Sequence, residues 1–329
     1  MPMEPPDTGL GPIGLILPTF LQGAAPSWPE HPGPVAGPDC DLAGVSRQAE
    51  HLGASALWAC DHVFWHGPCL ECMVALTVAA TATRRATVGT CVVQLPLRQA
   101  SVVAKQAATL HTLSGGRMIL GVGVGSHPGE YEQAGVDYHR RGRLLDAGIV
   151  ELRRSWASGQ GLADIEPEGA GAARYRQLPA PSPIPVWVGG SSEAALRRAA
   201  ALADGWMPLF LSPTAYGGAI ERLAKEVDRA GRTAGEVTPA MVLFVSIDDD
   251  PATARGRGTG WMSSLYGIPA KAFERHLVSG TATEVAEVVS LFRGAGAQHV
   301  AVYVTADQPI DQFERLISAL PGAGVALRG

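Results

Sequence analysis

The stretch PIPVWVGGSSEAALRRAAALADGWMP, residues 183–208, joins a strand pattern to a helix pattern across two glycines. Its apolar run from Ile184 to Val188, bounded by Pro and Gly, is typical of a buried strand. The Ala/Leu/Arg segment that follows has the composition of a helix, for which Ser191 or Ser192 is a suitable N-cap. The stretch therefore predicts one strand–turn–helix unit of an α/β fold.

The turn Gly189-Gly190-Ser191-Ser192 has two interpretations. Glycine lets a ligand approach the backbone closely because it carries no Cβ. The free N–H groups and the dipole at the start of a helix attract an anion. The turn could therefore hold a phosphate, or it could be only a tight connection. The local sequence leaves both open.

The same unit recurs along the whole chain of 329 residues. Each strand pattern is followed by a helical pattern, and the eight strand patterns cover residues 13–18, 56–65, 86–96, 117–125, 184–188, 205–210, 240–248 and 299–305. Eight such units predict a single (β/α)8 TIM barrel over residues 1–329, with a doubly wound open sheet as the alternative. Three segments lack a clear pattern and are expected to be insertions or covers at the C-terminal face of the barrel: 21–40, 157–182 and 250–280.

Bulk composition excludes several classes of protein. Hydrophobic residues make up 46% and charged residues 17%, which argues against disorder, and a net charge of −5 argues against a nucleic-acid partner. The N-terminus lacks the features of a signal peptide, and no apolar run is long enough to span a membrane. Five cysteines, an odd number, suggest reduced thiols and a cytoplasmic protein. The pair Cys69 and Cys72 lacks further ligands at suitable spacing, so we expect no metal site.

Chemistry in a barrel of this kind gathers where the strands end at their C-terminal side. Asp61 and His62 end the second strand, and a histidine beside a carboxylate suits acid/base catalysis. The alternative is a histidine that only hydrogen-bonds at a strand end. The other strand ends supply the expected lining of a substrate pocket: Trp65, Gln94, His127 and Trp206. His127 has the weaker case, because SHPGE also suits an exposed turn.

Other polar residues have simpler interpretations. The run GVGVG, residues 121–125, is not a dinucleotide fingerprint, and its glycines are expected to make room inside a crowded barrel or beside a flat ligand. Arginines in the first turn of a helix oppose its dipole, so Arg140, Arg141 and Arg143 predict carboxylate partners, either in the fold or across a subunit interface. The histidines on helices are expected at the surface: His51, His111 and His139.

Taken together, these blocks resemble the bacterial luciferase-like superfamily. The resemblance rests on residues 113–156 (LSGGRMILGVGVGSHPGEYEQAGVDYHRRGRLLDAGIVELRRSW), on the opening stretch, and on ALWACDHVFW and VGTCVVQLP. It implies a flavin or deazaflavin ring at the barrel mouth, backed by a cis peptide that GTCVV would place at Cys91–Val92. It also implies that Gly189, Gly190 and Ser191 hold the cofactor phosphate. Two further cofactor contacts are expected at the end of the fourth strand, Gly125 and Ser126.

The resemblance also suggests an activity. Asp61-His62 is similar to the Asp-His pair of deazaflavin-dependent members, and Trp65 lies near the position of their active-site Trp. The acidic residue that some members carry after the fourth strand is unmatched, since Ser126 stands there. We favour coenzyme F420-dependent hydride transfer involving a small organic substrate. The alternatives are an FMN-dependent monooxygenase supplied by a flavin reductase, and a non-catalytic flavin-binding barrel. We expect a homodimer.

Overall fold

The strands close into a barrel. The computed structural model describes residues 13–20, 41–158, 179, 183–306 and 309–320. Within them, eight parallel strands form a ring in which β8 pairs with β10 and β10 pairs with β1, so the alternative of an open sheet is excluded. The ring consists of β1 (Ile13–Ile16), β2 (Ala56–Ala59), β3 (Thr87–Thr90), β5 (Met118–Gly123), β6 (Val186–Gly189), β7 (Gly205–Met207), β8 (Thr238–Ile247) and β10 (His299–Val304).

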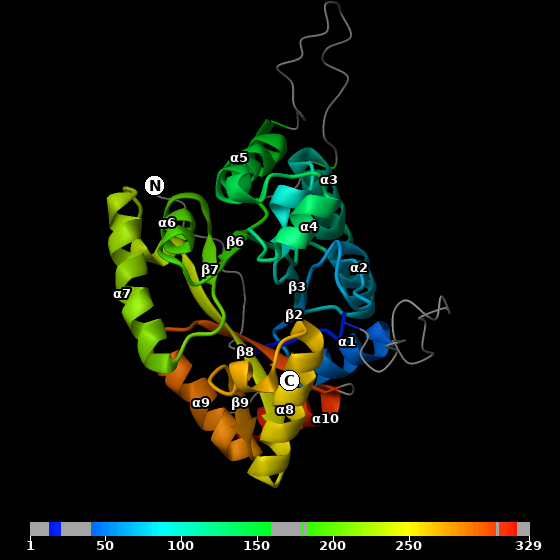
Figure 1. Ribbon diagram of the computed structural model, residues 1–329. Coiled ribbons are helices and arrows are strands. Elements are labelled where there is room, and N and C mark those ends of the chain that lie inside the picture. The colour runs from blue at the N-terminus through cyan, green and yellow to red at the C-terminus, as the bar shows by residue number, and fades with distance from the viewer. Residues whose placement is uncertain (1–12, 21–40, 159–178, 180–182, 307–308, 321–329) are drawn as a thin grey trace, which may run out of the picture.

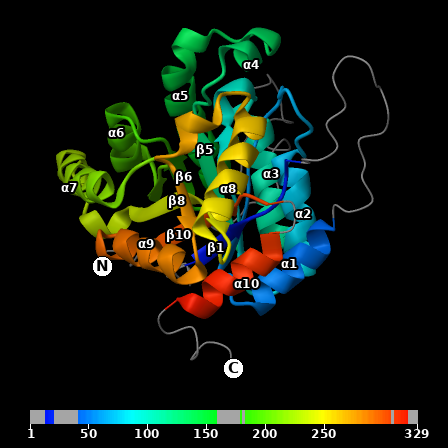
Figure 2. The same ribbon diagram turned by 60° about the horizontal axis from the view of Figure 1, so that its bottom comes forward.

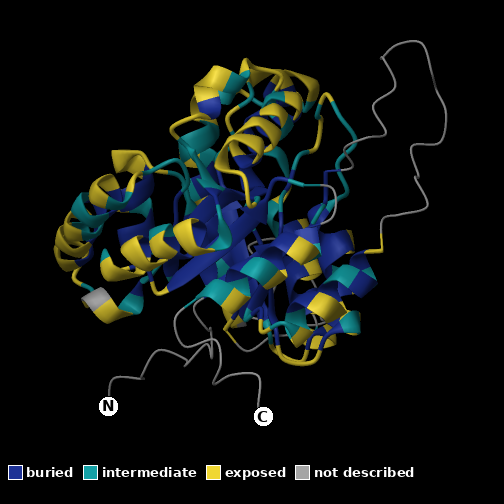
Figure 3. Ribbon diagram, turned by 90° about the horizontal axis from the view of Figure 1, so that it is seen from below, coloured by how far each residue is buried: buried dark blue, intermediate teal, exposed yellow. Residues whose placement is uncertain are grey.

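Helices surround this ring, and their inner faces and the strands are buried (Figures 1, 2 and 3). The principal helices around the barrel are α1 (Leu42–His51), α2 (Cys72–Ala82), α3 (Ala100–Leu113), α5 (Arg141–Ser158), α6 (Glu193–Leu202), α7 (Pro213–Arg229), α9 (Ala282–Gly294) and α10 (Pro309–Ala319). Short 3-10 turns complete the connections: η1 (Leu95–Leu97), η2 (Tyr138–Arg140), η4 (Ala234–Glu236) and η5 (Ala270–Phe273). No helix in the described ranges has the length and apolarity needed to cross a membrane.

Two tryptophans fill the inside of the ring. Trp58 and Trp187 are fully buried and their rings lie 5.3 Å apart. The indole N–H of Trp58 donates to Nε2 of the buried His299 at 3.0 Å. A methyl group at Gly89 would overlap the Trp58 ring, so the strand glycine is needed to admit a large side chain. The barrel is therefore a packed core at this level, and ligands are confined to its mouth.

The third strand is interrupted where the site begins. The sequence predicts one strand over residues 86–96, but β3 ends at Thr90 and a two-residue strand β4 (Val93–Gln94) follows. Between them the Cys91–Val92 peptide is cis, as the resemblance predicted. A side chain at Gly121 would overlap the Thr90 carbonyl oxygen, and one at Gly123 would meet Val92 at 2.5 Å. The interpretation of these glycines as making room in a crowded barrel is confirmed.

The segment 250–280 contains more regular structure than its sequence predicts. It forms α8 (Pro251–Tyr266), η5 and a strand β9 (Leu277–Gly280) that pairs in parallel with the C-terminal half of β8. Tyr266 and Phe273 pack ring against ring, and Tyr266 also approaches Phe244 of β8. The glycines of α8 and its low amphipathicity hide the helical periodicity. Residues 21–40 and most of 157–182 lie outside the described residues.

One expectation about surface residues is wrong, and another is tested only in part. Among the described residues none of Arg140, Arg141 and Arg143 pairs with a carboxylate, and a carboxylate partner across a subunit interface stays a prediction. The Arg141 guanidinium lies over the Tyr138 ring, 3.8 Å from its centre. The cation–π contact takes the place of an ion pair. His111 is buried, because α3 turns that face toward the barrel, and burial lowers its pKa.

Candidate active site

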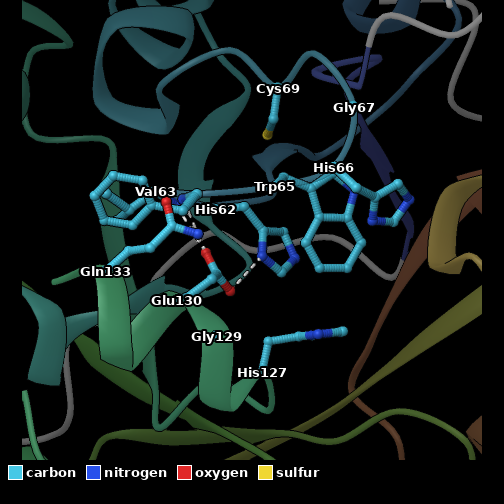
Figure 4. A pocket seen from close by; sticks show the side chains of 11 residues that line it. His62, Val63, Trp65, His66, Gly67, Cys69, His127, Gly129, Glu130 and Gln133 are labelled. Carbon is cyan, nitrogen blue, oxygen red and sulfur yellow. Dashed lines mark hydrogen bonds and ion pairs between the residues drawn. The ribbon is translucent and has the colours of Figure 1, made fainter. Parts of the chain in front are cut away.

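His62 follows β2 at the mouth of the barrel and forms a close pair with Glu130. Its Nδ1 lies 2.8 Å from Oε2 of that carboxylate. Its ring stacks on Trp65, with the two ring centres 3.8 Å apart and the planes 33° apart. Figure 4 shows that the His62 ring, Trp65 and His127 face a common space, with Glu130 on the side of the His62 ring away from Trp65. The position of the His62 ring therefore suits the predicted role in acid/base chemistry.

The Glu130 carboxylate is buried and accepts several hydrogen bonds. Its Oε1 accepts the backbone N–H groups of Val63 and Phe64 at 3.0 and 3.1 Å, and the side-chain amide of Gln94 also contacts it. Burial raises the pKa of Glu130, but the hydrogen bond and charge of His62, with the bonds from Phe64 and Gln94, outweigh burial and lower it. An ionised carboxylate only accepts hydrogen bonds, so the Nδ1 of His62 carries the proton. Its Nε2 is then the nitrogen left for a substrate.

Glu130 was not predicted from the sequence. An exposed turn was one interpretation of residues 126–130, but they lead into a short helix, α4 (Pro128–Gln133), which buries Glu130 and Tyr131. Proline in the first turn with an acidic residue after it is a helix-start signal that could have indicated this. An acidic residue after the fourth barrel strand is thus present, four positions beyond Ser126. The departure from the family pattern at Ser126 itself stays a prediction.

Asp61 is paired elsewhere. Both of its oxygens accept from the Arg98 guanidinium, at 2.7 and 2.8 Å, and Oδ2 also accepts the backbone N–H of Gln94 at 2.9 Å. The predicted Asp61–His62 pairing is therefore wrong, because successive residues beyond the strand end point in different directions. The ligand atoms of Asp61, Glu71 and Cys72 gather within 4.8 Å, but Arg98 already occupies both Asp61 oxygens.

A pocket of about 490 Å³ opens beside the His62–Glu130 pair. It is lined by His62, Val63, Phe64, Trp65, His66, Gly67, Cys69, His127, Gly129, Glu130 and Gln133. Neither lysine nor arginine is among these lining residues. Burial, and to a smaller extent the charge of His62, lower the pKa of His127. The described wall of the pocket therefore carries aromatic rings, imidazole rings and one carboxylate.

Two residues predicted to line the pocket lie deeper. Trp206 is fully buried, stacks on Tyr216, and donates its indole N–H to the Gly190 carbonyl at 2.9 Å. Gln94 is also buried and lies behind His62. Strand ends expose only some of their residues, since alternate side chains point into the packed layers. Trp65 and His127 do line the pocket.

The Gly189–Ser192 turn, predicted to hold a phosphate, leads directly into α6. Gly190 has a φ of +107°, which favours glycine, and Ser192 is the N-cap, accepting from the Ala195 N–H at 3.2 Å. Ser191 is exposed at the start of the ten-residue α6. Gly189 instead makes room for Val92, which a methyl group there would meet at 3.0 Å. The half-buried Cys91 and Val92 lie between this turn and His62 in strand order.

The end of β5 provides the remaining predicted cofactor contacts. Gly125 has a φ of +67° and packs against the Gln94 side chain, while Ser126 is exposed. Their roles toward a cofactor stay predictions.

Ser191→Glu should weaken binding of a phosphate-bearing cofactor by about tenfold or more, because it adds a negative charge at the turn. Titration with F420 and with FMN measures this. Ser191→Gln is the control, equal in size but neutral, and should change affinity by less than about threefold. Stability should not fall, since Ser191 is exposed and an acid near a helix N-terminus is favourable. Equal affinities of the two variants would remove this turn as the phosphate site.

The comparisons with known proteins agree with the fold. The family model described as luciferase-like monooxygenase matches residues 20–262, and the chain belongs to this family. An uncharacterized protein of Mycobacterium tuberculosis is 36% identical over 186 residues, covering 55% of this chain and 61% of the relative. The phthiodiolone/phenolphthiodiolone dimycocerosates ketoreductase of the same species is 31% identical over 199 residues, covering 58% and 52%. The chain thus spans only about half to three fifths of these curated relatives.

A solved structure extends the similarity over nearly the whole chain. An F420-dependent secondary alcohol dehydrogenase, in complex with an F420–acetone adduct, superposes with a TM-score of 0.77 at 18% identity. The match covers 94% of this chain and 99% of that structure. At this identity the similarity establishes the shared barrel and nothing about the site.

Proposed function

We propose that this protein is a coenzyme F420-dependent oxidoreductase that interconverts a carbonyl group and an alcohol on a small organic substrate. The observation that carries the proposal is the His62–Glu130 pair at 2.8 Å in the wall of the pocket, where Nε2 of His62 has no hydrogen-bond partner among the described residues. A proton donor and acceptor at that place is what reduction of a carbonyl oxygen requires. The similarity to a ketoreductase, and in fold to an F420-dependent secondary alcohol dehydrogenase, supports the same reaction class.

The described residues fit a cofactor of this type. Gly190 leaves open space where other residues carry a Cβ, apart from Ala195 at 3.3 Å, and the first-turn amides of α6 lack intrahelical acceptors. Cys91, Val92 and the Gly189–Ser191 turn would therefore hold the ring and the phosphate. When bound, the deazaflavin supplies or accepts a hydride.

The protein's own part is to handle the proton. During reduction the doubly protonated imidazolium of His62 donates its Nε2 proton to the substrate oxygen and becomes the neutral Nδ1–H imidazole, and the ionised Glu130 stabilises the imidazolium through Nδ1–H. During oxidation Nε2 accepts the hydroxyl proton. Trp65 packs against the His62 ring and restricts its rotation.

The alternative is an FMN-dependent monooxygenase, which the family name supports. An anaerobic assay separates the two. We expect oxidised F420 to bind and to be reduced by simple secondary alcohols under argon, with the change followed by F420 absorbance. An enzyme that ignores F420, and that acts only with reduced FMN and oxygen, would contradict the proposal.

A further inference from the structure

Gln94 connects the groups around His62. It ends β4 directly after the cis peptide, and its side chain is 3% exposed. Its Nε2 lies 3.2 and 3.1 Å from the two oxygens of Glu130, 3.2 Å from the Asp61 carbonyl oxygen, and 3.2 Å from Nδ1 of His62. One amide nitrogen therefore faces four polar atoms of the site.

Counting donors decides which of these contacts are hydrogen bonds. A primary amide has two N–H groups. Nδ1 of His62 donates to Glu130 and so accepts nothing from Gln94, which leaves the Asp61 carbonyl and the Glu130 carboxylate as the two acceptors. The flipped amide would place its oxygen against the carboxylate, acceptor against acceptor. The observed orientation is thus the one that chemistry permits.

The Gln94 backbone is also fixed by a hydrogen bond to a buried group. Its N–H donates to Oδ2 of the buried Asp61, and Arg98 neutralises Asp61 through two hydrogen bonds. The side-chain oxygen has no hydrogen-bond partner among the described residues, and a side chain at Gly125 would overlap it. The amide consequently cannot swing away from Glu130 without losing bonds at both ends.

We propose that Gln94 is a positioning residue that holds the Glu130 carboxylate against Nδ1 of His62, so that Nε2 stays directed at the substrate. The kinetic consequence of this inference rests on the proposed function, but the state of the histidine ring does not. Asp61 accepts the Gln94 backbone N–H, and Arg98 in turn binds the Asp61 carboxylate. Gln94 touches no substrate in this role.

Gln94→Met tests the inference, because methionine has a similar volume but no N–H group. Histidine ring ¹⁵N and ¹H NMR of the protein without cofactor reports the Nδ1–H proton of His62, assigned by its absence in His62→Gln. We expect this proton to exchange with water about tenfold faster, since the carboxylate loses one charge-assisted donor. In the alcohol assay, kcat should fall about tenfold while KM changes less than about twofold.

Gln312→Met is the matched control. Gln312 is also buried, and its Oε1 accepts the Ile247 N–H across the α10–β8 contact. This variant should lower the melting temperature without altering the His62 signal. If Gln94→Met does not fold, Gln94→Leu repeats the test with another apolar side chain.

Different results would contradict the positioning role of Gln94 and the proposed F420-dependent function. An unchanged Nδ1–H exchange rate in a folded Gln94 variant overturns the positioning role. A faster exchange in a protein that never turns over F420 supports the positioning role and removes the proposed function.

Discussion

His62→Ala should lower turnover by about a hundredfold or more, the scale usual for loss of a general acid or base. The reason is that Nε2 of His62 is the proton-transfer group proposed for the pocket, while Glu130 is already occupied by Nδ1 and backbone N–H groups. Steady-state kinetics with F420 and an alcohol under argon measure the loss. Cofactor affinity should change far less, because the proposed phosphate site lies at the Gly189–Ser191 turn.

Two further variants distinguish a role of His62 in proton transfer from a purely structural role. His62→Gln keeps an N–H that can reach Glu130 but cannot transfer a proton near neutral pH, so it should remain folded and be almost as inactive as His62→Ala. His51→Ala removes an exposed histidine on α1 and should keep full turnover. If His62 variants melt at lower temperature yet turn over normally in the folded fraction, His62 only braces the strand end.

Arg98→Leu should destabilise the protein by about 3–5 kcal/mol, the usual cost of removing one partner from a buried ion pair. Asp61 has a fully buried side chain, and Arg98 supplies two of its hydrogen bonds. The Gln94 N–H also donates to the carboxylate but does not neutralise its charge. Chemical unfolding of the variant measures the free energy.

An exposed pair provides the comparison for Arg98→Leu. Arg222 and Glu193 also form an ion pair, at 3.0 Å, but both side chains are about half exposed. Arg222→Leu should therefore cost less than about 1 kcal/mol. Adding Asp61→Asn to Arg98→Leu should recover part of the loss, because the stranded charge is removed. Equal losses of unfolding free energy in Arg98→Leu and Arg222→Leu would show that the buried Asp61–Arg98 pair stabilises the fold no more than an exposed pair.

The barrel and the place of its mouth were predictable from local sequence. Strand runs such as 184–188, bounded by Pro and Gly and followed by helical periodicity, depend only on neighbours in the chain. Their order then confines chemistry to the strand ends, and His62 was found there. The cis peptide at Cys91–Val92 was expected from the family resemblance, and the structure confirms it.

The structure of segment 250–280 could not be predicted from its local sequence pattern. Its strand β9 exists because β8 offers an unpaired edge beyond its contact with β7, which no periodicity within the segment reveals. Its helix α8 lacks a clear apolar stripe, so the sequence indicated a helix only faintly.

By itself, the sequence determined the order of the strands, the glycine turn before α6 and the histidine at the end of β2, because each follows from residues close together in the chain. Only the tertiary structure decided which carboxylate serves that histidine. Asp61 is adjacent to His62 in sequence yet pairs with Arg98, while Glu130 arrives from 68 positions away. The physical reason is that buried charges must find partners, and the barrel brings residues from separate strands to one rim, where packing and hydrogen bonding choose among them.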